Sequence, residues 1–383
     1  MRGKVNFRNL SRYSDYCEKT YARHYRRPFA FMGFNERLVT EIVPANHELL
    51  GVMDCSFISK SGKETYGLGN FYNSSQDKAT KGLEISALGV VDVTDNTAYT
   101  LSARQTPPQT EIEELVADQP VTADAEISRV DFYAWHLRQD IETLLQFVTY
   151  LVVDGYYSKL KFVNTVLALG LQQIGKLRHD ANLRYLYHGP QKKYGARRKY
   201  DGKVKFDDVR RLSYVDQIEP DIHLYTAVVY NVNLKRNIRL VYLLNLKNKN
   251  KPGYALLFST DTELDPEKLY RYYKARFQIE FLFRDAKQFT GLTDCQARNQ
   301  ASLNFHFNAS LTALNLAKVD AYLSFGYDRE TPFSLATQKM VYFNRHFLEK
   351  VFAILALDPS LINCQPALAD LHTYGAIGWR PDC

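Results

Sequence analysis

The sequence predicts a mixed α/β fold, in which helices flank a sheet of parallel and antiparallel strands. Short apolar runs of strand length alternate along the chain with longer segments that have helical spacing. Strands that alternate with helices are typical of such sheets. About 45% of the 383 residues are hydrophobic and 13% are aromatic, so the chain can bury a large core.

The first segment, residues 1–46, is predicted to be helical and basic, with turns near Pro28 and Pro44. Basic residues crowd its first thirty positions: Arg2, Lys4, Arg8, Arg12, Lys19, Arg23, Arg26 and Arg27. Tyrosines are interleaved with these charges. The segment is either a solvated surface or a site of phosphate contact with aromatic stacking.

Strands are predicted next, at 48–59, 82–93 and 96–106. The polar, proline-bearing stretch 105–126 is expected to be a loop or a flexible insertion. A helix is expected from Ser128, a plausible N-cap, through 148.

A short buried strand follows at 149–158, then a helix that Gly170 ends, and then a strand at 171–178. The segment from Lys192 to Arg211 is a second basic cluster, with nine Lys and Arg residues against three Asp. It includes Arg197, Arg198 and Lys199. Like the first segment, it is either a solvated surface segment or a site of phosphate contact. Three further β-rich stretches follow at 223–234, 238–246 and 253–260.

One long helix is predicted from Pro266 through "YYKARFQIEFLFRDAK". At about 100° per residue, Tyr273, Arg276, Glu280 and Lys287 fall within roughly 60° of one another along about 20 Å of this helix. The common structural interpretation is an i, i+4 pair of Arg276 with Glu280 and a solvated lysine. The alternative is that this charged stripe faces a ligand.

Two aspartates follow buried strands. Asp54 comes after "LLGVM" and Asp154 after "TYLVV". Ligand sites in α/β sheets lie at strand ends, so both carboxylates are well placed for a metal ion. Each one taken singly is more commonly a turn or cap residue. Asp92 is the replacement candidate for Asp54.

These residues also carry a family resemblance. The stretch "YYKARFQIEFLFRDAKQFTGL" resembles the Y-R-E-K signature of bacterial insertion-sequence transposases of the DDE type, and all four positions match the family's spacing. "VVDGYYSK" resembles the block that holds the family's second catalytic Asp, and "GVMDCSFISKSGKETYGLG" resembles the first. The resemblance covers roughly residues 46–315.

The resemblance implies an RNase H-like core that cleaves DNA and transfers strands. It assigns Asp54, Asp154 and Glu280 as catalytic residues that hold two Mg²⁺ ions, for which Mn²⁺ can substitute. Tyr273 and Lys287, with Arg276, would bind DNA phosphates. The implied partners are double-stranded DNA at the element ends, target DNA and a second copy of the chain in a homodimer.

Two other classes of function stay open. One is a catalytically inactive or truncated transposase derivative that acts as a DNA-binding protein or inhibitor. The other is an RNase H-like nuclease without strand transfer. A tryptophan that handles a flipped base in a relative's β-rich insertion has no counterpart, because the only tryptophans are Trp135 and Trp379. Either Tyr225, Tyr230 or Tyr242 would then serve, or that step differs.

The expected organisation divides the chain into five segments. They are a basic helical DNA-contacting segment (1–46), the first part of the core (47–184), a β-rich insertion (185–260), the second part of the core (261–325) and a helical tail (326–383).

Composition excludes several classes. No apolar run is long enough to span a membrane. The five cysteines are scattered without a C-x-x-C pair, which argues against a zinc knuckle and favours a reducing cytoplasm. The net charge of +7 is a mild indication of a polyanionic partner. His136, His179, His188 and His306 lack paired metal spacing and are expected to be ordinary residues.

Overall fold

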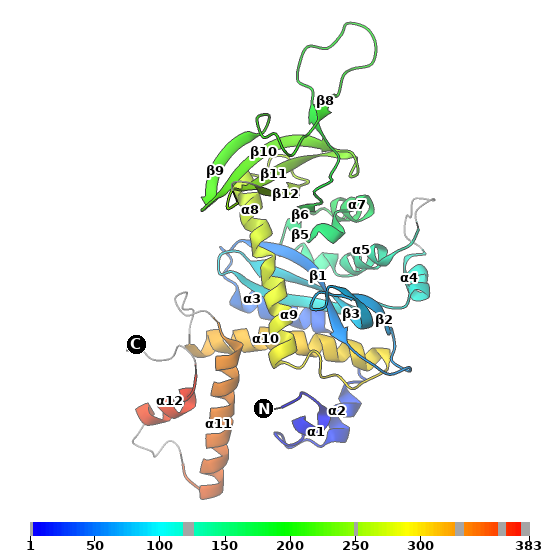
Figure 1. Ribbon diagram of the computed structural model, residues 1–383. Coiled ribbons are helices and arrows are strands. Elements are labelled where there is room, and N and C mark those ends of the chain that lie inside the picture. The colour runs from blue at the N-terminus through cyan, green and yellow to red at the C-terminus, as the bar shows by residue number, and fades with distance from the viewer. Residues whose placement is uncertain (1–2, 118–125, 249–251, 326–332, 359–364, 377–383) are drawn as a thin grey trace.

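The computed structural model describes residues 3–117, 126–248, 252–325, 333–358 and 365–376. It confirms the predicted mixed α/β class, because the strands form one twelve-stranded sheet with helices packed against it. The sheet order is β2-β3-β1-β5-β6-β12-β11-β10-β7-β8, and β4 and β9 pair with β3 and β10 (Figure 1).

Five strands form the half of the sheet that carries the carboxylates. β1 (Leu49–Ser59), β3 (Lys78–Asp92) and β4 (Thr97–Gln105) are antiparallel neighbours. β5 (Tyr150–Val152) and β6 (Gln172–Leu177) run parallel to β1. The order β4-β3-β1-β5-β6 is compatible with an RNase H-like core. A short strand, β2 (Gly69–Asn73), pairs with the first residues of β3.

The other half of the sheet is antiparallel. β12 (Gly253–Ser259) pairs with β6 and continues the sheet into β11 (Arg236–Asn245) and β10 (Ile222–Asn231). The remaining strands are β7 (Leu183–Leu186), β8 (Tyr200–Lys203) and β9 (Ser213–Glu219). This half has its own apolar core, which includes Phe258 and Leu240. Figure 1 shows it as the green strands, from which the loop between β7 and β8 projects.

Helices cover both faces of the strands that carry the carboxylates. α3 (Phe31–Ile42), α5 (Arg129–Gln139) and α7 (Leu160–Ala168) pack in one apolar cluster with Met53 and Leu151. α8 (Pro266–Ala275), α9 (Phe277–Phe289) and most of α10 (Gln300–Phe325) pack in the other, with Val52 and Ile85. The alternation of side chains along a strand explains why one strand serves both clusters.

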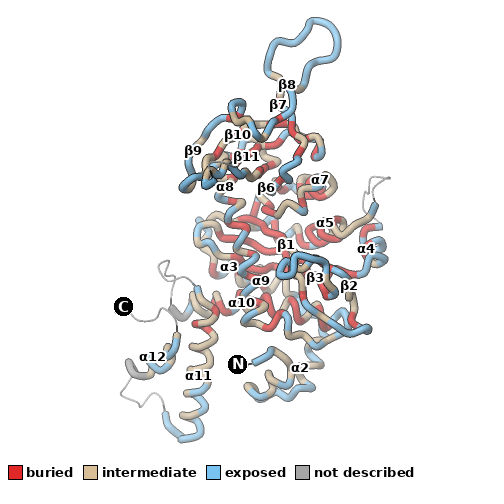
Figure 2. Tube along the Cα trace, viewed as in Figure 1, coloured by how far each residue is buried: buried red, intermediate tan, exposed pale blue. Residues whose placement is uncertain are grey.

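Short helices complete the chain. α1 (Phe7–Leu10) and α2 (Glu18–His24) lie before α3, while α6 (Ile141–Leu144) and the 3₁₀ turn η1 (Gly155–Tyr157) flank β5. α11 (Leu335–Leu355) and α12 (Gln365–Thr373) extend away from the sheet, and Figure 2 shows that they bury less of their surface than the central strands. No helix in the described part of the chain is long and apolar enough to cross a membrane.

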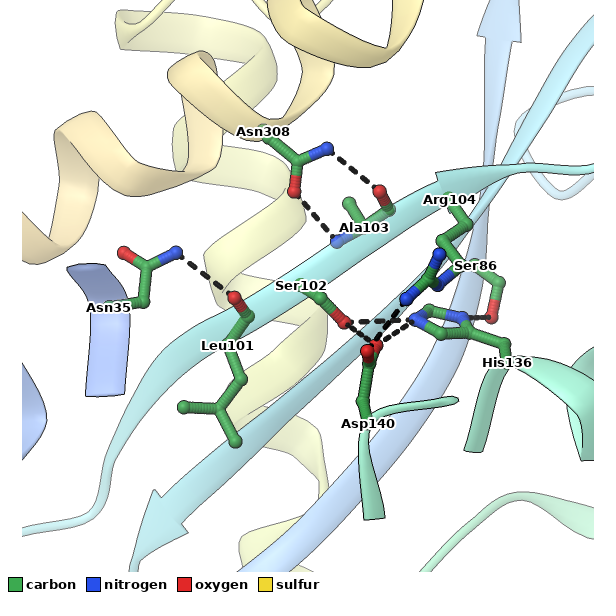
Figure 3. A network of polar contacts seen from close by, with 9 residues as sticks. All are labelled: Asn35, Ser86, Leu101, Ser102, Ala103, Arg104, His136, Asp140 and Asn308. Atoms are coloured by element: carbon green, nitrogen blue, oxygen red, sulfur yellow. Dashed lines mark hydrogen bonds and ion pairs between the residues drawn. The ribbon is translucent and has the colours of Figure 1, made fainter. Parts of the chain in front are cut away.

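Asparagine side chains cover the outer edge of β4, whose backbone lacks a neighbouring strand there. Asn308 on α10 accepts from Ala103 N at 2.9 Å and donates to Ala103 O at 2.8 Å. Asn315 makes the same pair of contacts with Thr100. Asn35 on α3 donates to Leu101 O at 3.1 Å, as Figure 3 shows. These amides satisfy backbone groups that would otherwise be buried without partners.

A buried polar network joins α5 to the sheet. Ser102 Oγ lies 2.9 Å from His136 Nε2 and donates to Asp140 at 2.6 Å, while His136 Nδ1 lies 3.0 Å from Ser86 Oγ (Figure 3). Arg104 donates to the other Asp140 oxygen at 2.6 Å. Ser86, His136 and Asp140 are all buried, so a substrate could not reach a serine nucleophile here, and the network is not the relay of a hydrolase. The network anchors α5, and His136 is a structural residue.

Three expectations about local structure were wrong, one of them because the helix expected from Ser128 through 148 is split at Asp140 into α5 and α6. Part of the stretch expected to be a loop forms α4 (Gln109–Val116), because Ile112 and Val116 lie one turn apart and bury the same face. Residues 118–125 lie outside the described part. The single helix predicted from Pro266 is interrupted at Arg276, where Ile279 N bonds Arg276 O and tightens the turn. Ser128 does begin a helix, with the reciprocal contacts of a capping box.

Candidate active site: three carboxylates around a buried arginine

Asp54 lies in the middle of β1 and points toward α9. Leu50 and Val52, four and two residues earlier, lie in the apolar cluster that includes α8 and α9, and alternation places Asp54 on the same face. The carboxylate accepts from Cys55 N at 2.8 Å, and 18% of the side chain is exposed. The strand therefore holds this side chain at a partly desolvated position.

Asp154 is the next carboxylate, and strand pairing brings it beside Asp54. β5 runs parallel to β1 with Val52 opposite Val152, so the chain just beyond β5 reaches the level of Asp54. Asp154 caps η1 and accepts from Tyr156 N at 2.8 Å. The short buried strand and the cap together fix where this carboxylate lies.

Glu280 comes from the other side, on the first turn of α9. Arg276, at the junction of α8 and α9, joins it to the sheet: Nη2 donates to Glu280 Oε1 at 2.7 Å and Nη1 to Asp54 Oδ2 at 3.1 Å. Arg276 is 6% exposed, and its Nε is buried without a hydrogen-bond partner in the described structure. The predicted Arg276–Glu280 pair is thus present, and the arginine is a buried bridge.

Burial and mutual repulsion perturb the two aspartates. Burial raises the pKa of Asp54 to about 7, the nearby charge of Asp154 adds to the rise, and Arg276 opposes it. Burial also raises the pKa of Asp154, with Tyr156 N opposing and Glu280 adding to the rise. Burial works against the charge of Arg276, but its interactions with Asp54, Tyr273 and Glu280 together outweigh burial, so the pKa of the guanidinium is raised. Three acidic groups therefore share one electrostatic environment.

The other two members of the charged stripe lie at different depths. The ring of Tyr273 lies 5.7 Å from the Arg276 guanidinium carbon, and burial raises the pKa of its phenol. Lys287 lies seven residues beyond Glu280 on the same face of α9, about 10 Å along its axis. It is half-buried, burial lowers its pKa, and no carboxylate among the described residues pairs with it.

The basic residues Arg197, Arg198 and Lys199 lie apart from the carboxylates. They belong to the exposed loop between β7 and β8, which projects from the antiparallel half of the sheet (Figure 2). Arg198 pairs with Asp201 and covers the ring of Tyr187 at 4.4 Å. The loop is therefore partly ordered by its own charges.

The tyrosines expected to replace a base-handling tryptophan differ in access. Tyr242 is 2% exposed and donates to Phe206 O at 2.7 Å, so its ring cannot stack on a base in this arrangement. Tyr225 is half-buried between Tyr214 and Tyr242. Tyr214 is 54% exposed, which makes it the more accessible ring of this group. Trp379 lies outside the described residues.

Sequence analysis missed a second cluster of ligand-type side chains. His47 Nδ1 lies 2.7 Å from Asp92 Oδ2 and 3.1 Å from Asp95 Oδ2, and all three side chains are buried. Pairing of Leu49 with Asp92 brings the start of β1 to the end of β3, so only the register reveals this contact. The cluster lies at the opposite end of β1 from Ser59. It holds the segment before β1 against the β3–β4 turn.

Asp54, Asp154 and Glu280 fit a hard divalent cation by their chemistry. All three offer carboxylate oxygens, which Mg²⁺ prefers, and burial together with the charge of Asp154 raises the pKa of Asp54 although Arg276 opposes the rise. The ligand atoms of His47, Asp92 and Asp95 all lie within 4.8 Å of one another. The oxygens of Asp54, Asp154 and Glu280 do not form such a close group among the described residues. A cation bound to the three carboxylates would draw them together.

Comparison with known families agrees with this geometry. Residues 136–316 match the model of a family described as the transposase DDE domain. The matched segment contains Asp154, Arg276 and Glu280, whereas β1 with Asp54 precedes it. No curated protein matches the chain. This similarity supports a DDE-type transposase, a class of enzymes that generally use divalent metal ions.

Proposed function

We propose that the protein is a DNA transposase that cleaves phosphodiester bonds at the ends of an insertion sequence and transfers the strands to target DNA. One observation carries the proposal. Carboxylates from β1, from the end of β5 and from α9 converge around one buried arginine, and two of the three lie in a segment similar to the transposase DDE domain. We place its action in the cytoplasm, on nucleoid DNA and as a homodimer.

In this proposal Asp54, Asp154 and Glu280 hold two Mg²⁺ ions. Ions held there would lower the pKa of a nucleophilic water or 3′-hydroxyl and neutralise charge on the leaving oxygen. Cys55 N and Tyr156 N orient the two aspartates, because each donates to one oxygen, Oδ1, of its carboxylate. Tyr273 and Lys287 bind phosphates beside the cleaved bond, while Arg276, which is buried between Asp54 and Glu280, orients those two carboxylates.

A reaction with Mg²⁺ and DNA that contains the element ends tests the proposal. Joined products identify strand transfer, nicked products without joining identify a simple nuclease, and retarded but intact DNA identifies a binding protein. Asp154→Asn is the matched control, because it removes one charge at constant shape. Binding without cutting by the parent protein would contradict the proposal.

The pH dependence of stability provides a separate check on Asp54. Its pKa is about 7 in the folded chain and lower in the unfolded chain, so the folded state binds the extra proton between about pH 4 and pH 7. Stability therefore falls as pH rises through this window. We expect Asp54→Asn in EDTA to melt higher than the parent at pH 8 and to lose this advantage at pH 5. The gain is at most about 4 kcal/mol.

Thermal melts of both proteins across this range measure the effect. Asp77→Asn, an exposed aspartate on the β2–β3 turn, is the control and should show no comparable pH-dependent gain. Equal melting temperatures of the Asp54 variant and its parent at every pH would show that the carboxylate is not electrostatically strained.

The projecting loop is expected to supply non-specific affinity. Replacing Arg197, Arg198 and Lys199 with alanine should flatten the dependence of log K on log salt for duplex DNA by up to roughly 2.7, because each phosphate contact contributes about 0.9. Binding measured between 50 and 200 mM salt gives the slope. An unchanged slope would mean that the loop is exposed to solvent and does not contact DNA phosphates.

A further inference from the structure

A polar hollow of about 560 Å³ lies at the far end of β1 from the His47 cluster. Ser59, Lys60 and Ser61 form one wall, and the loop after α9 forms the other with Thr293, Cys295, Gln296 and Arg298. Its lining therefore offers two cations, three hydroxyls and an amide. No carboxylate lines it among the described residues.

The two cations of the hollow lack acidic partners in the described structure. Lys60 is half-buried and donates to the carbonyl oxygen of Cys295. Burial lowers the pKa of Lys60, and the charge of Arg298 lowers it further. The nearest acidic residue of the loop, Asp294, accepts from Val5 N at 2.7 Å and so turns toward the N-terminal segment. Two crowded cations without a counter-charge favour an anionic ligand.

The hollow continues a line that starts at the candidate active site. Lys60 follows Asp54 by six residues, about 20 Å of extended chain. On α9, Lys287 follows Glu280 by seven residues, and the loop that follows α9 lines the hollow. The line spans about six nucleotides at 3.4 Å each along one DNA strand. Contact of Val5 with Asp294 also brings the basic N-terminal segment next to it.

We infer that the hollow of Lys60 and Arg298 binds the phosphate backbone of duplex DNA about six base pairs from the cleaved bond, with Lys287 between the two positions. This inference rests on the proposed function, because the distance to the cleaved bond is counted from the carboxylates at which cleavage is proposed to occur. The hydroxyls of Ser59, Ser61 and Thr293 would donate to the same phosphate oxygens.

Salt-dependent binding of the full chain to a duplex tests the inference. Lys60→Gln with Arg298→Gln is expected to flatten the log–log salt slope by roughly 1.8, since each lost phosphate contact removes about 0.9. The matched control is Lys78→Gln with Lys235→Gln, which removes the same charge from two exposed hairpin turns. A slope equal to that of the control pair would overturn the inference.

Alkylation of Cys295 gives a second measurement that needs no substitution. The half-buried thiol lines the hollow, so bound duplex should slow its reaction with iodoacetamide, as mass spectrometry of the Cys295 peptide would show. Equal rates with and without DNA would overturn the inference. Neither measurement requires cleavage: a protein that protects Cys295 but does not cut DNA keeps this site and loses the proposed function.

Discussion

Glu280→Gln is expected to abolish Mg²⁺-dependent cleavage while DNA binding stays within a few-fold of the parent. Glutamine keeps the shape of the side chain and can still accept from Arg276, but it removes the charge that a divalent cation needs. A loss of roughly 10³-fold in the rate of nicking corresponds to about 4 kcal/mol of transition-state stabilisation. Single-turnover nicking and an electrophoretic binding assay measure the two effects separately.

Glu267→Gln is the matched control for this substitution. Glu267 lies in the first turn of α8 and takes no part in the cluster around Arg276. It should cut DNA like the parent. Substantial Mg²⁺-dependent cutting by Glu280→Gln would exclude Glu280 as a ligand, whatever the control does.

Arg276→Gln is expected to have the largest effect on stability. The family resemblance in the sequence implied that Arg276, like Lys287, would bind DNA phosphates. The structure changes this expectation for Arg276, because the guanidinium is buried between Asp54 and Glu280. Removing one partner of a buried ion pair costs about 3–5 kcal/mol, and the partial exposure of Glu280 brings the expected cost to about 2–4 kcal/mol.

Divalent cations distinguish a local charge effect from general misfolding. In EDTA the Arg276 variant should melt well below the parent, and Mn²⁺ should recover more of its stability than it adds to the parent, because the ion replaces the missing positive charge. Lys287→Gln is the control, since no carboxylate among the described residues pairs with Lys287. It should melt like the parent yet nick DNA more slowly. A low melting temperature of Arg276→Gln that Mn²⁺ leaves unchanged would mean that the arginine serves packing alone.

The fold class followed from local patterns because they depend on short-range physics. The apolar runs at 48–59 and 82–93 contain β1 and most of β3, and Ser128 begins α5 as its capping pattern predicts. The helix α4 was missed because two apolar residues in a proline-bearing, acidic stretch give a weak period. The break at Arg276 was missed because helical spacing continues across it.

The candidate site shows a similar division. Strand ends and helix spacing suggested Asp54, Asp154 and Glu280, and the parallel register of β1 and β5 brings the first two to one level. What the sequence could not give is the depth of Arg276. Its bond to Asp54 joins residues 222 positions apart, and such a contact depends on how α9 packs on β1. The same holds for His47 with Asp92, whose contact follows from the antiparallel register of β1 and β3.

Titration of Mn²⁺ followed by electron paramagnetic resonance, with the parent and with Asp154→Asn, tests directly whether Asp54, Asp154 and Glu280 form a metal site. Asp154 is the carboxylate of the three that makes no ion pair with Arg276 in the described structure, so its loss should weaken cation binding without releasing the arginine. We expect the parent, bound to duplex DNA, to bind Mn²⁺ at micromolar concentration and so to reduce the resonance signal of free Mn²⁺. The Asp154 variant should need at least a tenfold higher Mn²⁺ concentration for the same reduction of the signal. Equal binding by the two proteins would contradict the assignment of these carboxylates as the metal site.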